Sequence, residues 1–310
     1  YPLLVASAYS GFVIWHMGYS SSAALFVATP GHLLEDRVGI IPVTETILSS
    51  TNIVMALMAL AIITIICPLM RPKDKDIIEF TPNTIDNIDN SALDNQSELT
   101  LIEKFENHRA LNIFLGFALV SYIVVTYTQN GFSLNLNIVS WTFLAFGLIL
   151  AASPMHFIKL INNAAATVGP IILQYPFYSG IMGMMATTGL MKVITDWIIS
   201  ISTPETLGFF AFLSGGLVNM FIPSGGGQWA VQGPIMIEAA LSLNVNPSVV
   251  VLGVAYGDQW SNMIQPFWTI PILAIAGLHM RQILGYTFVI FIMTGFLYGG
   301  GMLYMGSGNI

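Results

Sequence analysis

The sequence predicts an all-α polytopic membrane protein built as an inverted repeat, with discontinuous helices and a re-entrant hairpin. Hydrophobic residues make up 55% of the 310 residues and charged residues only 8%, whereas soluble domains carry roughly 25% charged residues. Several apolar runs have the length of about 20 residues that crosses a bilayer core. Two polar, glycine-rich stretches, 219–234 and 255–266, interrupt such runs. Unpaired backbone groups are costly in lipid, so both stretches must be buried in protein or line a wet cavity.

Composition also excludes several classes of protein. The single Cys67 rules out an internal disulfide, and the absence of a basic stripe argues against nucleic-acid binding. The sequence has no His-x-x-Glu-His or Gly-x-Ser-x-Gly motif and no cysteine cluster, so it offers no support for metal or serine chemistry. We therefore predict that the protein is not an enzyme and needs no cofactor other than a coupling ion.

Residues 1–70 form the first predicted region. Residues 1–29 are apolar but are interrupted by a polar stretch at 16–22, which predicts two half-helices with an unwound joint. A loop at 30–50 follows, and 51–70 is a full span. The chain begins without Met and is already apolar, so we expect a preceding segment with a glycine-rich hairpin of its own.

Residues 71–109 form a predicted cytoplasmic linker. They hold five of the nine Lys and Arg residues and nine of the sixteen acidic residues. Such a composition favours a solvated connector, with a short amphipathic helix at 97–109. Placing this linker inside also places Lys159 and Arg281 inside, in agreement with the excess of basic residues expected in cytoplasmic loops.

Residues 110–310 form the second predicted region. We expect spans at 110–128 and 138–152, a loop at 153–162, a span at 164–190 broken by Pro170 and Pro176, and an interfacial helix at 191–203. Within the segment 204–246, residues 205–222 are about one helix long but 234–243 are only half a span, so a re-entrant hairpin with its tip at 223–233 fits better than two full crossings. A broken span at 247–277 and a last span at 287–305 complete the chain.

A weak internal repeat relates the two regions. Ala8-Tyr9-Ser10-Gly11 is similar to Ala255-Tyr256-Gly257-Asp258, and each word lies in a broken span that is followed by a loop and one full span. In the predicted topology the two broken spans run in opposite directions. That arrangement is typical of inverted repeats, which place a substrate site at the interface between the copies.

Several motifs in the sequence resemble those of a known family. They include Ala28-Thr29-Pro30-Gly31, Gly39-Ile40-Ile41-Pro42-Val43, Pro223-Ser224-Gly225-Gly226-Gly227-Gln228-Trp229 and Ala255-Tyr256-Gly257-Asp258-Gln259-Trp260. Over essentially the whole chain, the sequence resembles the bacterial short-chain fatty acid transporters, the acetoacetate/butyrate permease-like family. The resemblance implies a multi-pass protein of the bacterial cytoplasmic (inner) membrane, similar to the wider ion-transporter group, that moves short-chain monocarboxylates by symport.

A short monocarboxylate needs N–H donors for its charge and a small apolar wall for its tail. The tip at 223–227 offers backbone N–H groups at the start of a half-helix, where the helix dipole favours anions. Glutamine and serine side chains add donors, and tryptophan rings are suited to flank the acyl chain. We predict the substrate-binding residues Ser224, Gly225, Gly226, Gly227, Gln228, Trp229, Gln232 and Trp260, with Ser21 and Thr29 from the first broken span.

A coupling ion needs a different set of groups. Asp258 is one of very few acids outside the loops, and ionisable residues at membrane depth are usually functional. It can carry a proton or, with neighbouring oxygens, bind Na⁺. The predicted ion-coupling residues are Asp258, Asn262, Gln259 and Asn219. His16 and His32 are expected at the membrane interface, and Glu238 near the exit of the hairpin.

The leading hypothesis is a secondary transporter of short-chain fatty acids or acetoacetate, driven by H⁺ or Na⁺. A cation antiporter or a carrier of another small carboxylate remains open as the alternative, as do an intramembrane enzyme and a scaffold from other classes. The expected partners are the monocarboxylate and membrane lipid, with a homodimer left open.

Overall fold

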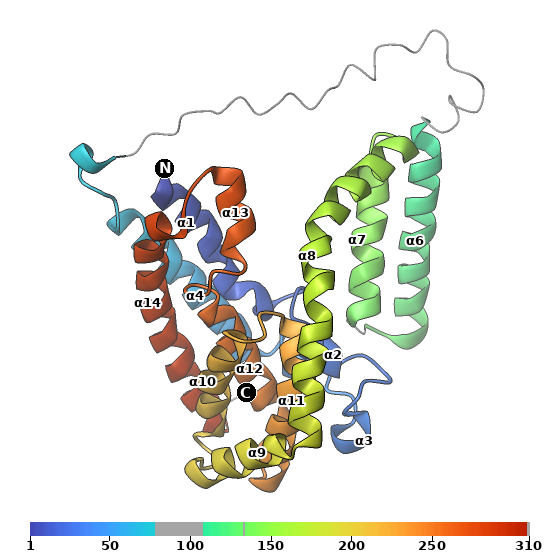
Figure 1. Cartoon of the computed structure of the whole chain (residues 1–310). Helices are drawn as coiled ribbons and strands as arrows, with labels where there is room; N and C mark the ends of the chain where they lie inside the picture. Colours follow the sequence, from blue (N-terminus) through green and yellow to red (C-terminus); the bar gives the residue numbers. More distant parts are fainter. Residues whose placement is uncertain (78–107, 133, 309–310) are drawn as a thin grey trace. The chain divides into compact units, whose positions relative to one another are not determined.

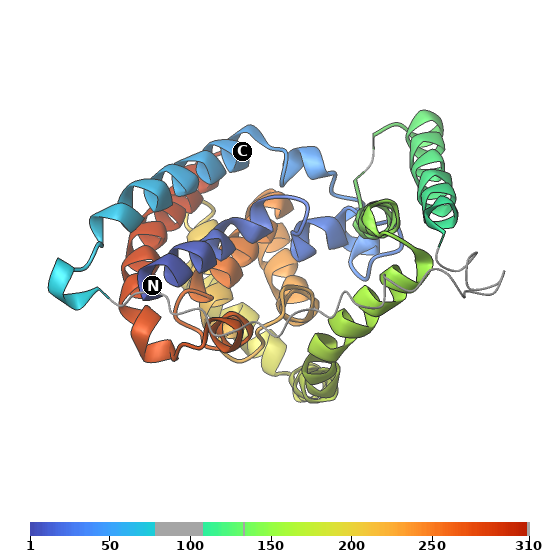
Figure 2. The same cartoon turned by 90° about the horizontal axis from the view of Figure 1, so that it is seen from above.

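The computed structural model describes residues 1–77, 108–132 and 134–308, and every regular element within these ranges is a helix. The chain divides into two compact units. One consists of residues 1–78 and 178–310, and the other of residues 79–177. Figure 1 and Figure 2 show the helices of each unit from two directions.

The first unit holds the two interrupted segments and the helices that surround them. Its N-terminal elements are α1 (Pro2–Ser10), η1 (Gly11–Met17), α2 (Ser22–Val27), α3 (Glu35–Val38), η2 (Val43–Glu45), α4 (Ser50–Leu69) and η3 (Asp74–Asp76). Its C-terminal elements are the end of α8, then α9 (Leu190–Ile201), α10 (Leu207–Asn219), α11 (Gly225–Ser242), α12 (Pro247–Ser261), α13 (Thr269–Ala276) and α14 (Met280–Gly306).

Both predicted helix breaks are present in the fold. The first lies between η1 and α2, and the second between α12 and α13, where Pro266 disfavours helical backbone at the residue before it. Side chains satisfy the backbone carbonyls that the breaks release. The hydroxyl of Tyr298 donates to the carbonyl of Val13 at 2.7 Å, and the Asn52 amide donates to the carbonyl of Met17 at 3.0 Å. The breaks are therefore built into the protein interior, as buried backbone requires.

The predicted hairpin at 204–246 becomes α10 and α11 joined by a short turn. Pro223 follows the end of α10, and Ser224 caps α11 by accepting a hydrogen bond from the backbone N–H of Gly227 at 3.3 Å. The 13 residues of α10 rise about 20 Å, which is less than the ~30 Å of a bilayer core. Because α10 is too short to span the core by itself, we keep the re-entrant hairpin as a prediction.

Glycines bring α10 and α12 into close contact. A Cβ atom added to Gly257 would lie 2.1 Å from the carbonyl oxygen of Phe212, and one added to Gly253 would lie 2.8 Å from that of Gly208. Only glycine permits this separation between the two helices. The packing brings the end of α10 beside Asp258 on α12, and so places two predicted ion-coupling elements together.

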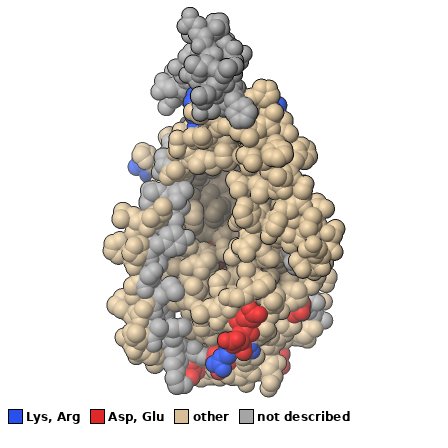
Figure 3. Space-filling view, turned by 90° about the vertical axis from the view of Figure 1, so that its right-hand side faces the viewer, with Lys and Arg blue, Asp and Glu red and all other residues tan. Residues whose placement is uncertain are grey.

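The outer faces of the first unit are apolar. Helices α4 and α14, which pack against each other, are both long and apolar enough to cross a membrane. Their outward side chains include Leu57 and Phe296, the latter 78% exposed. The face drawn in Figure 3, which is a different side of the molecule, is also mostly uncharged apart from a group of acidic and basic side chains near its lower end. Such surfaces need an apolar solvent, so the chain is a membrane protein.

The second unit contains α6 (Arg109–Asn130), α7 (Leu136–Leu150) and the first part of α8 (Pro154–Thr187). Helix α6 is the third helix with the length and composition of a membrane span. The predicted loop at 153–162 is wrong, because α8 begins at Pro154, a residue that needs no hydrogen bond in the first helical turn. The predicted break at Pro170 and Pro176 is also wrong, since α8 continues through both. Most of the amphipathic helix predicted at 97–109 lies outside the described residues.

Candidate substrate and ion site

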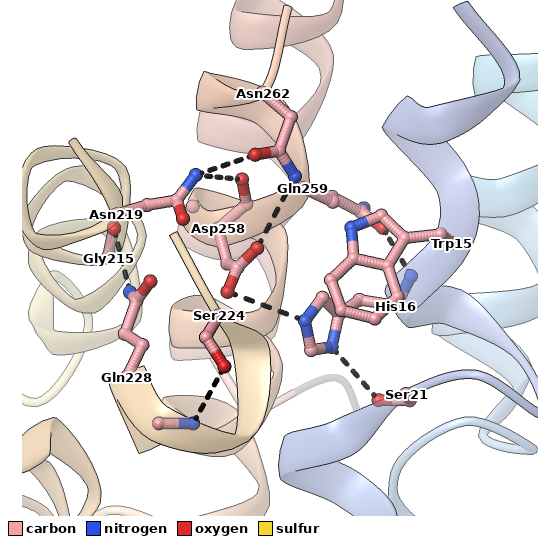
Figure 4. A network of polar contacts seen from close by, with 12 residues as sticks. Trp15, His16, Ser21, Gly215, Asn219, Ser224, Gln228, Asp258, Gln259 and Asn262 are labelled. Carbon is pink, nitrogen blue, oxygen red and sulfur yellow. Dashed lines mark hydrogen bonds and ion pairs between the residues drawn. The ribbon is translucent and has the colours of Figure 1, made fainter. Parts of the chain in front are cut away.

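The centre of the site is a buried pair of ionisable side chains from the two interrupted segments. Nε2 of His16, on η1, lies 3.6 Å from Oδ2 of Asp258, on α12. The two side chains are only 1% and 2% exposed. Figure 4 shows them facing each other between η1, α12 and the start of α11. A buried carboxylate is costly unless it is paired, so this contact helps to explain how the fold tolerates Asp258.

Neighbouring groups fix the position of His16. Its backbone N–H donates to Oε1 of Gln259 at 2.9 Å, and its Nδ1 lies 3.4 Å from the hydroxyl oxygen of Ser21. The Trp15 ring lies against the imidazole, with centroids 3.7 Å apart. These contacts aim Nε2, the ring nitrogen without a hydrogen bond, at Asp258 and the start of α11.

Asn219, the last residue of α10, connects that helix to α12. Its amide nitrogen lies 3.0 Å from the carbonyl oxygen of Asp258, 2.8 Å from the hydroxyl oxygen of Ser261 and 2.9 Å from Oδ1 of Asn262. The Asn262 amide nitrogen lies in turn 3.5 Å from Oδ1 of Asp258. The C-terminal end of one helix is thereby held against the carboxylate of another.

The first turn of α11 lies directly against the histidine. A Cβ atom added to Gly225 would be 2.5 Å from Nε2 of His16 and 2.7 Å from the Trp15 ring. Glycine therefore lets the positive end of α11 approach the buried pair. One turn further along α11, the amide of Gln228 donates to the carbonyl of Gly215 at 2.8 Å and to Oε1 of Gln232 at 3.0 Å.

Buried polar atoms without a hydrogen-bond partner gather in this region and divide into two sets. Nitrogen atoms form one set: Trp15 Nε1, His16 Nε2, Trp229 Nε1 and Gln259 Nε2. Oxygen atoms form the other: Asn219 Oδ1, Gln228 Oε1 and Asp258 Oδ2. Most buried polar atoms in proteins are paired. The nitrogen set is suited to an anion and the oxygen set to a cation.

Comparison with known proteins identifies the family. The family model described as "Short chain fatty acid transporter" matches residues 1–305. The chain belongs to that family. A protein of Escherichia coli (strain K12) named for short-chain fatty acid transport is 36% identical over 298 residues, which cover 96% of this chain and 68% of that protein. A protein of Haemophilus influenzae (strain ATCC 51907 / DSM 11121 / KW20 / Rd) with the same kind of name is 36% identical over 314 residues, covering 98% and 70%. No solved structure matches the chain.

In this member of the short-chain fatty acid transporter family, most predicted site residues come together. Those with contacts in or beside the polar cluster are Ser21, Asn219, Ser224, Gly225, Gln228, Gln232, Asp258, Gln259 and Asn262. Gly226 and Gly227 continue the first turn of α11. Trp229 is fully buried and packs against Gly233 of its own helix. The predictions of substrate and ion contact for these residues stay predictions.

Two predicted substrate residues have other surroundings. The Trp260 ring stacks on Phe291 of α14, with centroids 4.1 Å apart, and its N–H donates to the Phe291 carbonyl at 2.7 Å. Thr29 follows the end of α2, and its hydroxyl donates to the carbonyl of Leu25 at 2.6 Å. Both contacts are structural. Glu238 is exposed on α11 and pairs with Arg37 at 3.0 Å.

Sequence reasoning missed His16 and Trp15. His16 was expected at the interface, but it is buried against Asp258. The available signal was its position at the polar joint of the first broken span, where the repeat predicts a site. His32 does have a structural role, with Nε2 3.1 Å from the carbonyl oxygen of Gly39. Among the described residues, no group of three or more His, Cys, Asp and Glu side chains is placed to hold a metal ion.

Proposed function

We propose that the protein is a secondary active transporter that carries short-chain fatty acids or acetoacetate across the bacterial cytoplasmic membrane, coupled to a gradient of H⁺ or Na⁺. The observation that carries this proposal is the buried His16 Nε2, which has no hydrogen bond and lies beside the start of α11, at the meeting point of the two interrupted segments. The names of the two relatives support the same substrate class.

The substrate carboxylate binds at the first turn of α11 in this proposal. Backbone N–H groups at a helix start and the helix dipole favour an anion there. His16 Nε2 and the six-membered edge of the Trp15 ring lie against the same turn, as the short distances to a Cβ atom at Gly225 show. The Trp15 ring, which is partly exposed, supplies an apolar wall for a short acyl chain. A small site with few donors is suited to a monocarboxylate rather than a larger polar molecule.

The transport step is alternating access between two inverted repeats. The first copy comprises α1, η1, α2 and α4, and the second comprises α12, α13 and α14. Packing between the copies supports this division, because η1 and α2 contact α12 while α4 contacts α14. The ionised substrate, the His16–Asp258 pair and the start of α11 then lie between the copies, where rocking of one copy against the other changes the side that is open.

Uptake of radiolabelled butyrate into proteoliposomes tests the proposal. Neutral butyric acid crosses lipid unaided, so uptake is measured at about pH 8, where a carboxyl group with an ordinary pKa of about 4 is almost fully ionised. Protein-free liposomes give the passive flux to subtract. We expect protein-dependent uptake driven by an inward Na⁺ or H⁺ gradient. The absence of such uptake under both gradients would refute the proposal.

The same vesicles separate the alternative functions. If the protein carries another small carboxylate, lactate or succinate would inhibit butyrate uptake strongly. Analogues of butyrate would then inhibit it only weakly. A cation antiporter would exchange Na⁺ for H⁺ with no carboxylate present. Under our proposal acetate, butyrate and acetoacetate compete with one another, and ion flux requires one of them.

A further inference from the structure

Three buried oxygen atoms without a donor come from three different helices. They are Oδ1 of Asn219 on α10, Oε1 of Gln228 on α11 and Oδ2 of Asp258 on α12, and the last faces His16 Nε2 at 3.6 Å, which is beyond hydrogen-bond distance. The three side chains are 0%, 0% and 2% exposed, so bulk water does not hydrate them. An unsatisfied buried acceptor costs folding free energy, and three in one region indicate a missing electropositive partner.

The orientations of the two amides are fixed by their nitrogen contacts. The amide nitrogen of Asn219 faces the carbonyl oxygen of Asp258 at 3.0 Å, and that of Gln228 faces the carbonyl oxygen of Gly215 at 2.8 Å. Turning either amide over would place oxygen against oxygen. The unpaired atoms are therefore oxygens by necessity.

The same contacts place the three residues beside one face of α10. Gly215 and Asn219 are one turn apart on α10, so they lie on the same face of that helix. Gln228 is held at the first of them and Asp258 at the second. Figure 4 shows the Asn219 and Gln228 side chains on one side of Asp258 and the His16 ring, which faces Asp258 Oδ2, on the other.

We propose that Asn219 Oδ1, Gln228 Oε1 and Asp258 Oδ2 bind a Na⁺ ion. A hard cation prefers oxygen ligands, and the carboxylate balances its charge. Asn219 ends α10, where the negative end of the helix dipole favours a cation, and ends of interrupted helices coordinate Na⁺ in other transporters. A water molecule has two hydrogens for three acceptors and no charge to offset that of Asp258.

Such a site explains how cation and substrate are coupled, a step that rests on the proposed function. Asp258 lies 3.6 Å from His16, which belongs to the carboxylate site. The negative charge of Asp258 therefore repels a carboxylate that binds beside His16. Bound Na⁺ neutralises the charge, so Na⁺ raises the affinity for the carboxylate and, by linkage, the carboxylate raises the affinity for Na⁺.

Thermal unfolding of the purified protein in detergent tests the site without any transport assay. The midpoint is measured against increasing NaCl, with KCl and choline chloride at the same ionic strength as references. A ligand that binds only the folded state raises the midpoint as its concentration grows. We expect a saturable rise with Na⁺ alone. Equal midpoints in the three salts, or an equal rise with K⁺, would overturn the proposal.

Two variants locate the ion. Asp258→Asn is expected to abolish the Na⁺-dependent rise, and Gln228→Met, which keeps the side-chain volume, to weaken the apparent Na⁺ affinity by roughly tenfold or more. Gln232→Met is the matched control, since both polar atoms of Gln232 already have protein partners. It is expected to lower the midpoint in every salt and keep the rise with Na⁺. A full Na⁺ response in Gln228→Met would refute the assignment even where Asp258→Asn fails to fold.

Butyrate uptake then separates the two proposals. Uptake driven by a Na⁺ gradient at equal pH on both sides supports both of them. Uptake driven by a pH gradient and unaffected by Na⁺ keeps the proposed function and removes the Na⁺ site, leaving a proton on Asp258. A Na⁺-dependent midpoint without butyrate uptake under either gradient keeps the Na⁺ site and removes the proposed function.

Discussion

The hydroxyl of Tyr9 donates a 2.8 Å hydrogen bond to the backbone carbonyl of Asn262. Tyr9 lies in α1 and Asn262 at the break after α12, so the contact joins the two interrupted segments across 253 residues of sequence. The carbonyl belongs to the break, where it has no partner in a continued helix. One side chain thus stabilises the irregular backbone that carries the site.

Replacing Tyr9 by Phe is expected to lower the free energy of unfolding by roughly 1–3 kcal/mol, because a buried carbonyl loses the hydroxyl that donates to it. Thermal unfolding in detergent measures the change. Tyr19→Phe is the control, because the Tyr19 side chain is 60% exposed. Equal midpoints for the two variants would show that the hydrogen bond contributes nothing to stability.

Packing between α10 and α12 gives a second stability prediction. Gly257→Ala adds a Cβ atom where the backbone of Phe212 and Gly216 leaves no room, at 2.1 and 2.5 Å. Backbone atoms cannot move aside as a flexible side chain can, so we expect a loss of roughly 1–3 kcal/mol or more. Gly285→Ala on α14 meets no atom within 4 Å and serves as the control. A Gly257→Ala protein as stable as Gly285→Ala would contradict the observed helix separation.

Much of this fold could be predicted from residue chemistry along the chain. Interruption of an apolar run by Gly18 and three serines, or by Gln265-Pro266, is a local property, and both breaks are present. Local reasoning was wrong for α8, where Pro170 and Pro176 were expected to break the span. Proline removes one hydrogen bond, and a long helix tolerates that loss when the freed groups are satisfied by other means.

The residues of the site likewise divide into those that the sequence predicted and those that it missed. Asp258 and Asn219 were predicted because polar residues in an apolar setting are visible in the sequence. The pairing of His16 with Asp258 was not, since it depends on the contact between segments 242 residues apart. Trp260 was assigned to the substrate because a tryptophan ring in the second polar stretch is suited to flank an acyl chain. Adjacent residues on a helix point in different directions, and Trp260 contacts α14.

The first turn of α11 provides a paired test of the substrate site. In Gly225→Ala the new Cβ atom falls 2.5 Å from Nε2 of His16, whereas in Gly285→Ala on α14, outside the site, it meets nothing within 4 Å. Alanine has a helix propensity about 1 kcal/mol better than that of glycine, so neither substitution weakens its own helix. We expect Gly225→Ala to lose most butyrate uptake while remaining folded, and Gly285→Ala to retain it. Equal uptake by the two variants would place the substrate elsewhere.

The two tryptophans beside the broken spans allow the last test. Trp15 has an unpaired N–H and lies against His16, whereas the Trp260 N–H is already bonded to Phe291. We expect Trp15→Phe to raise the KM for butyrate several-fold, because a phenyl ring preserves the apolar wall but has no donor. Trp260→Phe should lower the midpoint of thermal unfolding through its lost hydrogen bond and leave the KM unchanged. The reverse result would return Trp260 to the substrate site, where the sequence had placed it, and would require α12 to rotate during transport.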